Sequence, residues 1–169
     1  QYIHSQWTYK RAYEGITALR PNLQLELIAR NPVLPTETAS IGTLVDKLAG
    51  HAGATFSVPV ISVAETLAEK VLSFLRRYEQ FKAGAMQQAW DETLVRHLYD
   101  VCLMYSQQPS LLEEACTVFA ALIVVDQQEF GTQFPAFLSD PKRVLQSALN
   151  AIEHDATIAE QYEGKLMPL

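Results

Sequence analysis

Alternation of apolar and polar residues marks the first part of the chain as β-structure. Residues 6–13 alternate aromatic and polar side chains, and residues 23–28 alternate again. Gly15 and Pro21 lie between the two runs, which is typical of a turn. We therefore predict an antiparallel hairpin. Its second strand would carry three leucines on one face and Glu26 on the other.

Short elements follow the hairpin. Two prolines within residues 31–35 indicate a loop. Thr38 or Ser40 is expected to cap a short helix that ends at Ala49, before two nearby glycines. The β-rich run at residues 56–61 predicts a third strand.

Helical periodicity dominates from Ser62 onward. Ser62 is a natural N-cap, and Glu65 three positions later completes a capping box. The segment 79–89, which contains Gly84, is the expected flexible connection to the next helix. Apolar residues of the first helix recur at a spacing that turns one side toward a core, namely Val63, Leu67, Val71, Phe74 or Leu75, and Tyr78.

Three further helices are expected in the rest of the chain. Asp91 caps the first, a largely apolar and buried helix follows at residues 111–125, and an amphipathic helix at residues 141–162 comes after a loop around Pro135. The inward stripe of the first of these helices is expected to be Leu94, Leu98, Val101, Cys102 and Tyr105.

The order of strands before helices predicts an α+β fold. We expect an antiparallel or mixed sheet domain in residues 1–61 and a helical bundle in residues 62–169. The abrupt start in a strand-like segment suggests a piece of a longer protein. The longest apolar run, residues 117–125, covers about half of a membrane span, so we expect a soluble protein without a membrane partner.

Charge and cysteine content narrow the function. A net charge of −6 argues against broad binding to nucleic-acid phosphates, although a local basic groove is compatible with it. The two cysteines form neither a disulfide framework nor a metal motif, which fits a reducing cytoplasm. The sequence contains no phosphate-binding glycine loop and no Gly-x-Ser-x-Gly turn.

Two cations on one helix are the first candidate site. Lys70 and Arg77 are seven positions apart, so they lie two turns apart on nearly the same side. Such a pair could hold a triphosphate, with Lys as a point charge and Arg as a bidentate fork. From spacing alone, a solvated basic edge is the commoner explanation.

Two carboxylates are the other candidates. Asp100 lies four positions after Arg96 and three after His97, so it is either half of a local ion pair or a general base. Glu26, in the middle of a strand, is either on the solvent side of an edge strand or a metal ligand in a cleft.

The order of these segments resembles the AbiEii family, nucleotidyltransferase toxins of bacterial toxin–antitoxin pairs that act in abortive infection and phage defence. The family has an extended Leu-Glu-Leu and a Pro-containing loop. A Thr-Leu-Ala-Glu-Lys helix follows, with an Arg two turns on, and then an Arg-His-x-Tyr-Asp or Lys-Asp-x-Tyr-Asp helix. The corresponding residues here are 25–27, Pro35, 66–70, Arg77 and 96–100.

The resemblance implies transfer of nucleotides from a nucleoside triphosphate (NTP) to a tRNA, another RNA or a protein acceptor, with Mg²⁺ as cofactor and a cognate antitoxin as partner. Glu26 would be the third carboxylate of the metal site. Lys70 would bind the nucleotide phosphates and Arg77 would support them. Asp100 would act as a base or hold Lys70 in place.

One departure from the family limits this expectation. The Gly-Ser turn followed by Asp-x-Asp, which supplies two of the three metal carboxylates, does not occur in this chain. We therefore expect this polypeptide to be inactive by itself, with no cofactor assigned to it alone, and His97 stands where many relatives have Asp.

Two other functions are compatible with the sequence. The helical half could be a non-catalytic module that binds an antitoxin or another protein, with the strands as scaffold. An RNA-binding domain would need a cationic patch of Arg76, Arg77 and Arg96, and the negative net charge disfavours it.

Overall fold

A computed structural model describes residues 2–8, 22–86 and 88–166. The chain forms two compact units, Gln1–Asn31 and Pro32–Leu169. The architecture combines two small antiparallel sheets with several helices, which confirms the predicted α+β class. The predicted division into residues 1–61 and 62–169 stays a prediction.

The first unit is the predicted hairpin. Strand β1 (Tyr2–Thr8) pairs antiparallel with β2 (Asn22–Ile28), and the register sets His4 opposite Glu26. Strand β1 begins four residues earlier than the alternation indicated. The expected turn at Gly15 and Pro21 lies outside the described residues.

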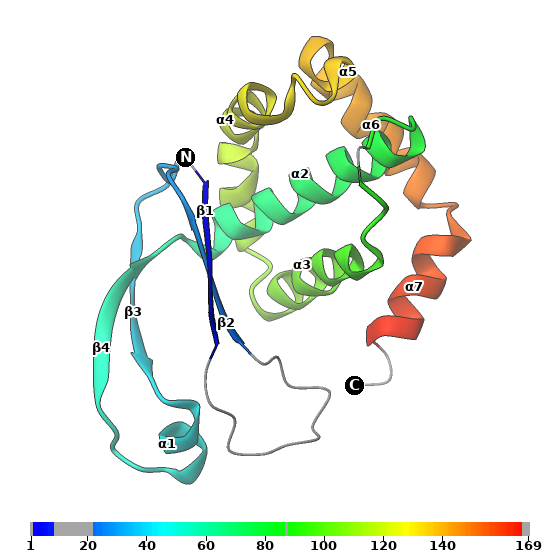
Figure 1. Cartoon of the computed structure of the whole chain (residues 1–169). Helices are drawn as coiled ribbons and strands as arrows, with labels where there is room; N and C mark the ends of the chain where they lie inside the picture. Colours follow the sequence, from blue (N-terminus) through cyan, green and yellow to red (C-terminus); the bar gives the residue numbers. More distant parts are fainter. Residues whose placement is uncertain (1, 9–21, 87, 167–169) are drawn as a thin grey trace. The chain divides into compact units, whose positions relative to one another are not determined.

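The second unit begins with a hairpin that carries a short helix. Strand β3 (Glu37–Gly42) pairs antiparallel with β4 (Thr55–Val60), which confirms the third predicted strand, and helix α1 (Leu44–Ala49) lies between them (Figure 1). The prediction that a helix starts at Thr38 or Ser40 was wrong, because pairing with β4 holds these residues extended. Thr43 caps α1 instead.

Helix α2 (Val63–Lys82) starts at the predicted cap, but its second capping contact differs. The Ser62 hydroxyl accepts a hydrogen bond from the Glu65 amide at 3.1 Å, as expected. The buried Glu65 carboxylate does not complete a capping box. It accepts hydrogen bonds from the amides of Val33, at 2.9 Å, and Leu34, at 2.8 Å. The loop before β3 is thereby fastened to the start of α2.

Connections between the later helices differ from the predictions. Helix α2 continues to Lys82, four residues into the expected linker, and Gly84 turns the chain with φ of 65°. The loop expected around Pro135 contains the short helix α5 (Pro135–Ser139). The single helix expected at residues 141–162 is two helices, α6 (Pro141–Ile152) and α7 (Ala156–Leu166). Asp155 interrupts it, because its carboxylate binds the Thr157 amide at 2.9 Å.

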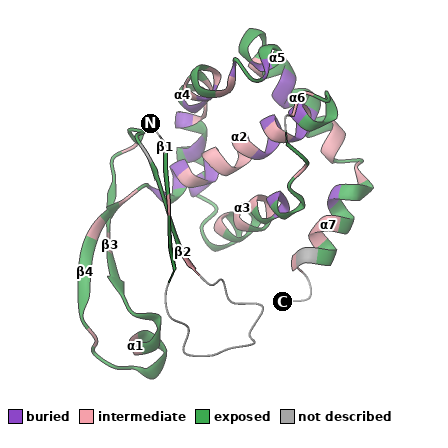
Figure 2. Ribbon diagram, in the orientation of Figure 1, coloured by how far each residue is buried: buried purple, intermediate pink, exposed green. Residues whose placement is uncertain are grey.

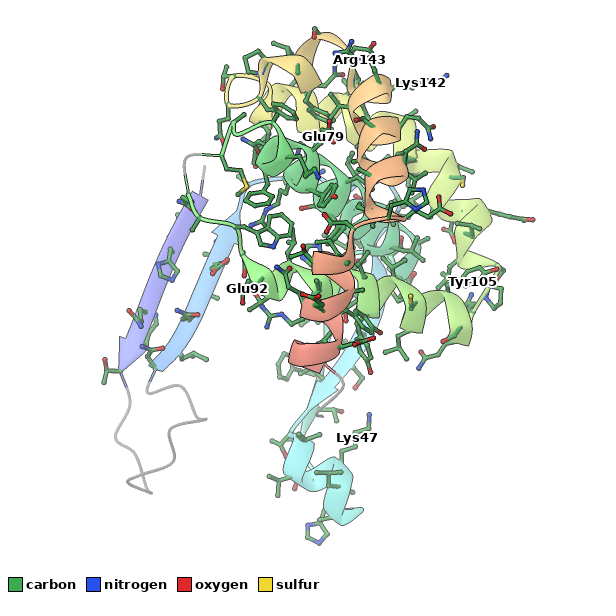
Figure 3. All side chains as sticks on the ribbon, turned by 90° about the vertical axis from the view of Figure 1, so that its right-hand side faces the viewer. Lys47, Glu79, Glu92, Tyr105, Lys142 and Arg143 are labelled. Carbon is green, nitrogen blue, oxygen red and sulfur yellow. The ribbon has the colours of Figure 1, made fainter. Side chains whose placement is uncertain are left out.

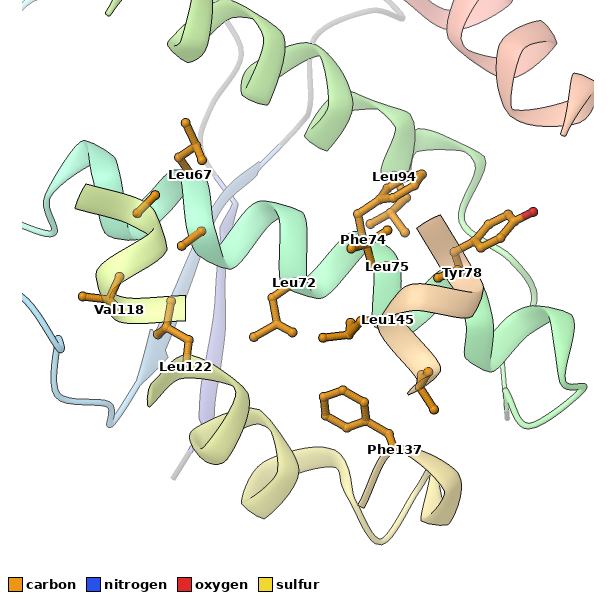
Figure 4. Close-up of a cluster of buried hydrophobic side chains, with 14 of the residues drawn as sticks. Leu67, Leu72, Phe74, Leu75, Tyr78, Leu94, Val118, Leu122, Phe137 and Leu145 are labelled. Atoms are coloured by element: carbon orange, nitrogen blue, oxygen red, sulfur yellow. The ribbon is translucent and has the colours of Figure 1, made fainter. Parts of the chain in front are cut away.

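Helix α2 lies at the centre of the helical part, and α3 (Arg96–Gln107), α4 (Leu111–Phe130) and α6 pack against it (Figures 1 and 2). The largest fully buried apolar side chains lie on this axis or face it, as Figure 4 shows for Tyr78, Phe74, Phe137, Leu72 and Leu122.

Helices α3 and α4 bury less than predicted. A short 3₁₀ turn, Glu92–Val95, is capped by Asp91 and contains the buried Leu94. Helix α3 itself has no buried residue, and Cys102 and Tyr105 are exposed. Helix α4 is longer than expected but buries only one side. Within the described residues, every helix is too short or too polar to span a membrane.

A buried ion pair joins α2 to α4. Arg76 Nε lies 2.7 Å from Asp126 Oδ2, and the two side chains are only 5% and 7% exposed. The Arg76 guanidinium also covers the Phe130 ring at 3.8 Å. Both charges are therefore desolvated, and each depends on the other for compensation.

This dependence predicts a large cost for removing one partner. Asp126→Ala should lower the free energy of unfolding by about 3–5 kcal/mol, because Arg76 would stay buried without a counter-charge. The double variant Arg76→Met/Asp126→Leu should recover most of that loss. Urea denaturation of the three proteins measures both effects, and a single variant as stable as the parent would contradict this account.

Candidate functional site

An ion pair between neighbouring helices brings two of the predicted site residues together. Lys70 Nζ on α2 lies 2.7 Å from Asp100 Oδ2 on α3, and the side chains are 27% and 39% exposed. The interpretation of Asp100 as the local partner of Arg96 is not supported, because Arg96 donates to the Thr93 carbonyl and hydroxyl instead. The pair is partly open to solvent, so a ligand can reach the ammonium.

Arg77 lies two turns farther along the same side of α2 and is half-buried. Burial lowers the pKa of its guanidinium, while the negative charge of Asp91 acts in the opposite direction. The positive charge of the adjacent Arg76 lowers it further. Arg77 is thus a cation held partly away from water, where its attraction for an anion is stronger than at a fully solvated surface.

His97 interacts electrostatically with Lys70, Arg77 and Asp100, and no defined role was predicted for it. Burial lowers the pKa of its imidazole below the ordinary value of 6.5, and the charges of Lys70 and Arg77 lower it further. The Lys70 backbone and the Asp100 carboxylate act in the opposite direction. Its Nδ1 atom is buried without a hydrogen-bond partner in the described part of the chain. Lys70, Arg77, His97 and Asp100 therefore form one electrostatic group, which we call the α2–α3 cluster.

A pocket of about 310 Å³ opens beside Arg77. The sequence pattern did not predict this pocket, although Ser73 and Gln80 continue the stripe of Lys70 and Arg77 along α2 and are its one local signal. Gln133, beyond the end of α4, could not be assigned to this pocket from the sequence, because only folding brings it to α2. The lining residues are Ser73, Arg76, Arg77, Gln80, Met86, Gln88, Phe130 and Gln133.

Glu26, the predicted metal ligand, belongs to the first unit, where β-pairing sets it opposite His4. Among the described residues, no group of three or more His, Cys, Asp or Glu side chains could hold a metal ion. The donors described here do not fit an Mg²⁺ site, and the role of Glu26 stays a prediction.

The α2–α3 cluster predicts an unusual titration. In NMR titrations the His97 imidazole should protonate below pH 6.5, and Lys70→Met should raise its pKa by removing a nearby positive charge. Because folding lowers this pKa, the stability linked to neutral His97 is present above about pH 6.5 and is lost as the pH falls. His97→Gln assigns the resonance.

Lys142→Met is the matched control, since Lys142 is exposed on α6 (Figure 3). It should leave the His97 titration unchanged. An ordinary pKa in the parent chain, or the same shift in both lysine variants, would contradict the electrostatic grouping.

Comparison with known proteins identifies the family. A family model described as "Nucleotidyl transferase AbiEii toxin, Type IV TA system" matches residues 1–168. Searches of curated proteins and of solved structures found no match. The match covers nearly the whole chain. The chain belongs to the AbiEii family of nucleotidyltransferase toxins from type IV toxin–antitoxin systems.

Proposed function

We propose that this chain provides the nucleotide-binding half of a toxin that transfers nucleotides from an NTP to an acceptor, either tRNA, another RNA or a protein. Lys70 and Arg77 bind the phosphates. The observation that carries the proposal is the 2.7 Å contact between Lys70 Nζ and Asp100 Oδ2, with Arg77 and His97 within electrostatic reach. The reaction would take place in the cytoplasm, where NTPs and tRNA are available.

The geometry supports Asp100 as the residue that positions Lys70. An ammonium group has three N–H donors, of which the contact with Asp100 uses one. The other two can bind phosphate oxygens, and the carboxylate keeps the flexible lysine chain in place. Positioning the cation before the nucleotide arrives reduces the entropy lost on binding.

A base role for Asp100 has less support than the positioning role. Its carboxylate already contacts an ammonium, which competes for the lone pairs that would accept a proton. His97 is the better candidate for accepting a proton from the attacking hydroxyl. Its lowered pKa keeps the imidazole neutral near pH 7, as a proton acceptor requires.

Transfer requires more than this chain contains. The family resemblance implies Mg²⁺, with Glu26 as one ligand, but the described donors do not form a metal site and the sequence has no Asp-x-Asp. We therefore assign no step through Mg²⁺ to these residues. The chain alone is proposed to bind NTP without transferring it.

The second candidate function is that of a non-catalytic module for binding the antitoxin, the partner that a type IV system implies. One observation favours it. Helix α1 has no buried residue, and its apolar side chains face solvent, with Leu44 at 67%, Val45 at 74% and Leu48 at 79% exposed. A solvated apolar helix face of this kind is typical of a surface that another protein covers.

The phosphate-binding role predicts a specific loss. Lys70→Ala should weaken binding of inorganic tripolyphosphate at least tenfold, because a charge-assisted hydrogen bond contributes about 1.5–3 kcal/mol. Isothermal titration calorimetry measures the affinity, and Lys142→Ala is the exposed control. Equal affinities in the parent and Lys70→Ala proteins, with the fold confirmed by thermal melting, would overturn the assignment.

Inactivity of the isolated chain is a separate prediction. Incubation with labelled NTPs, Mg²⁺ and total RNA should produce no label transfer, because two metal carboxylates of the family site do not occur in this sequence. Robust label transfer by the purified chain would refute this prediction.

A further inference from the structure

The pocket beside Arg77 has a lining that the phosphate-binding role does not explain. Besides its two arginines it contains three glutamines, a serine, a methionine and a phenylalanine. We propose that this pocket, named here the glutamine pocket, binds the base of the NTP whose phosphates contact Lys70 and Arg77. The inference rests on the proposed function and adds the part of the substrate that determines nucleotide choice.

The functional groups of the pocket suit a base better than a phosphate. A glutamine amide has both donors and acceptors, and the edge of a nucleobase presents both kinds of group. A phosphate presents acceptors only, so the amide oxygens would oppose it. Met86 and Phe130 supply apolar surface against which a base can pack.

Charge compensation leads to the same assignment. The charge of Arg76 is already neutralised by Asp126 at 2.7 Å. Arg77 is thus the one lining residue whose charge no contact carboxylate neutralises in the described chain, and it lies where the pocket meets the α2–α3 cluster. The rest of the lining is uncharged, which suits a neutral ring and would leave a second phosphate group poorly compensated.

Helix geometry connects the pocket to the phosphate site. Lys70, Ser73, Arg77 and Gln80 lie within about 80° of one another around the axis of α2. They extend about 15 Å along the axis, from the Asp100 contact to the glutamines. A triphosphate on the two cations can therefore direct its nucleoside into the pocket without crossing to another face of the helix. The volume of about 310 Å³ lies at the lower end of the range for small-ligand sites.

The experiment compares nucleotides with a ligand that has no base. Calorimetry on the full chain gives the Kd of each of the four ribonucleoside triphosphates and of tripolyphosphate. We test Gln88→Ala and Gln133→Ala, whose side chains are exposed and replaceable without disturbing the core, and Gln128→Ala on α4, exposed and outside the pocket, as the control.

The parent chain should bind at least one NTP more tightly than tripolyphosphate and should discriminate among the four bases. Gln88→Ala and Gln133→Ala should weaken binding of the preferred NTP about three- to tenfold and reduce the discrimination among the four bases. Their affinity for tripolyphosphate should be unchanged. Gln128→Ala should match the parent throughout.

Two results would overturn the assignment while leaving the phosphate site intact. One is tripolyphosphate binding as tightly as every NTP. The other is an unchanged base preference in both pocket variants. If neither tripolyphosphate nor any NTP binds, or if Lys70→Ala leaves tripolyphosphate affinity unchanged, the phosphate site itself fails and the base pocket fails with it.

Discussion

The structure depends on burying Arg76 inside a helical core. Helix α2 is packed against α3, α4 and α6, so most of its circumference faces other helices. A guanidinium on such a helix costs several kcal/mol of desolvation unless a carboxylate neutralises it. Asp126 supplies that carboxylate from the side of α4 that faces α2. The contact between α2 and α4 therefore requires both an apolar surface and one correctly placed charge.

The same packing determines where function is possible on α2. Leu72 and Phe74 pack in the core, and Arg76 forms an ion pair with Asp126. The stripe through Lys70 and Arg77 is one part of the helix that stays partly open. Asp100 on α3 limits the motion of Lys70 without enclosing it, which preserves access for an anionic ligand. A rigid central helix thus positions charges more accurately than a loop would.

Local sequence signals predicted the elements they could define. The Ser62 cap, the alternation before Ile28 and the Asp91 cap each depend on neighbouring residues, and each was confirmed. Signals that depend on distant partners were misread. Glu65 matched a capping box but binds the loop at Val33, because that loop crosses the start of α2. The sequence predicted Lys70 and Asp100 as candidate site residues, but it did not predict their contact. That contact, and the position of Gln133 in the pocket, form only when the helices pack together.

The charges of the α2–α3 cluster favour an uncharged side chain at His97. Two cations near the imidazole and its burial both favour the neutral form. An aspartate at this position would instead add a second negative charge beside Asp100 and compete with it for Lys70. With histidine, Lys70 keeps Asp100 as its carboxylate partner in the described part of the chain. The neutral imidazole therefore leaves Asp100 as the carboxylate that holds Lys70.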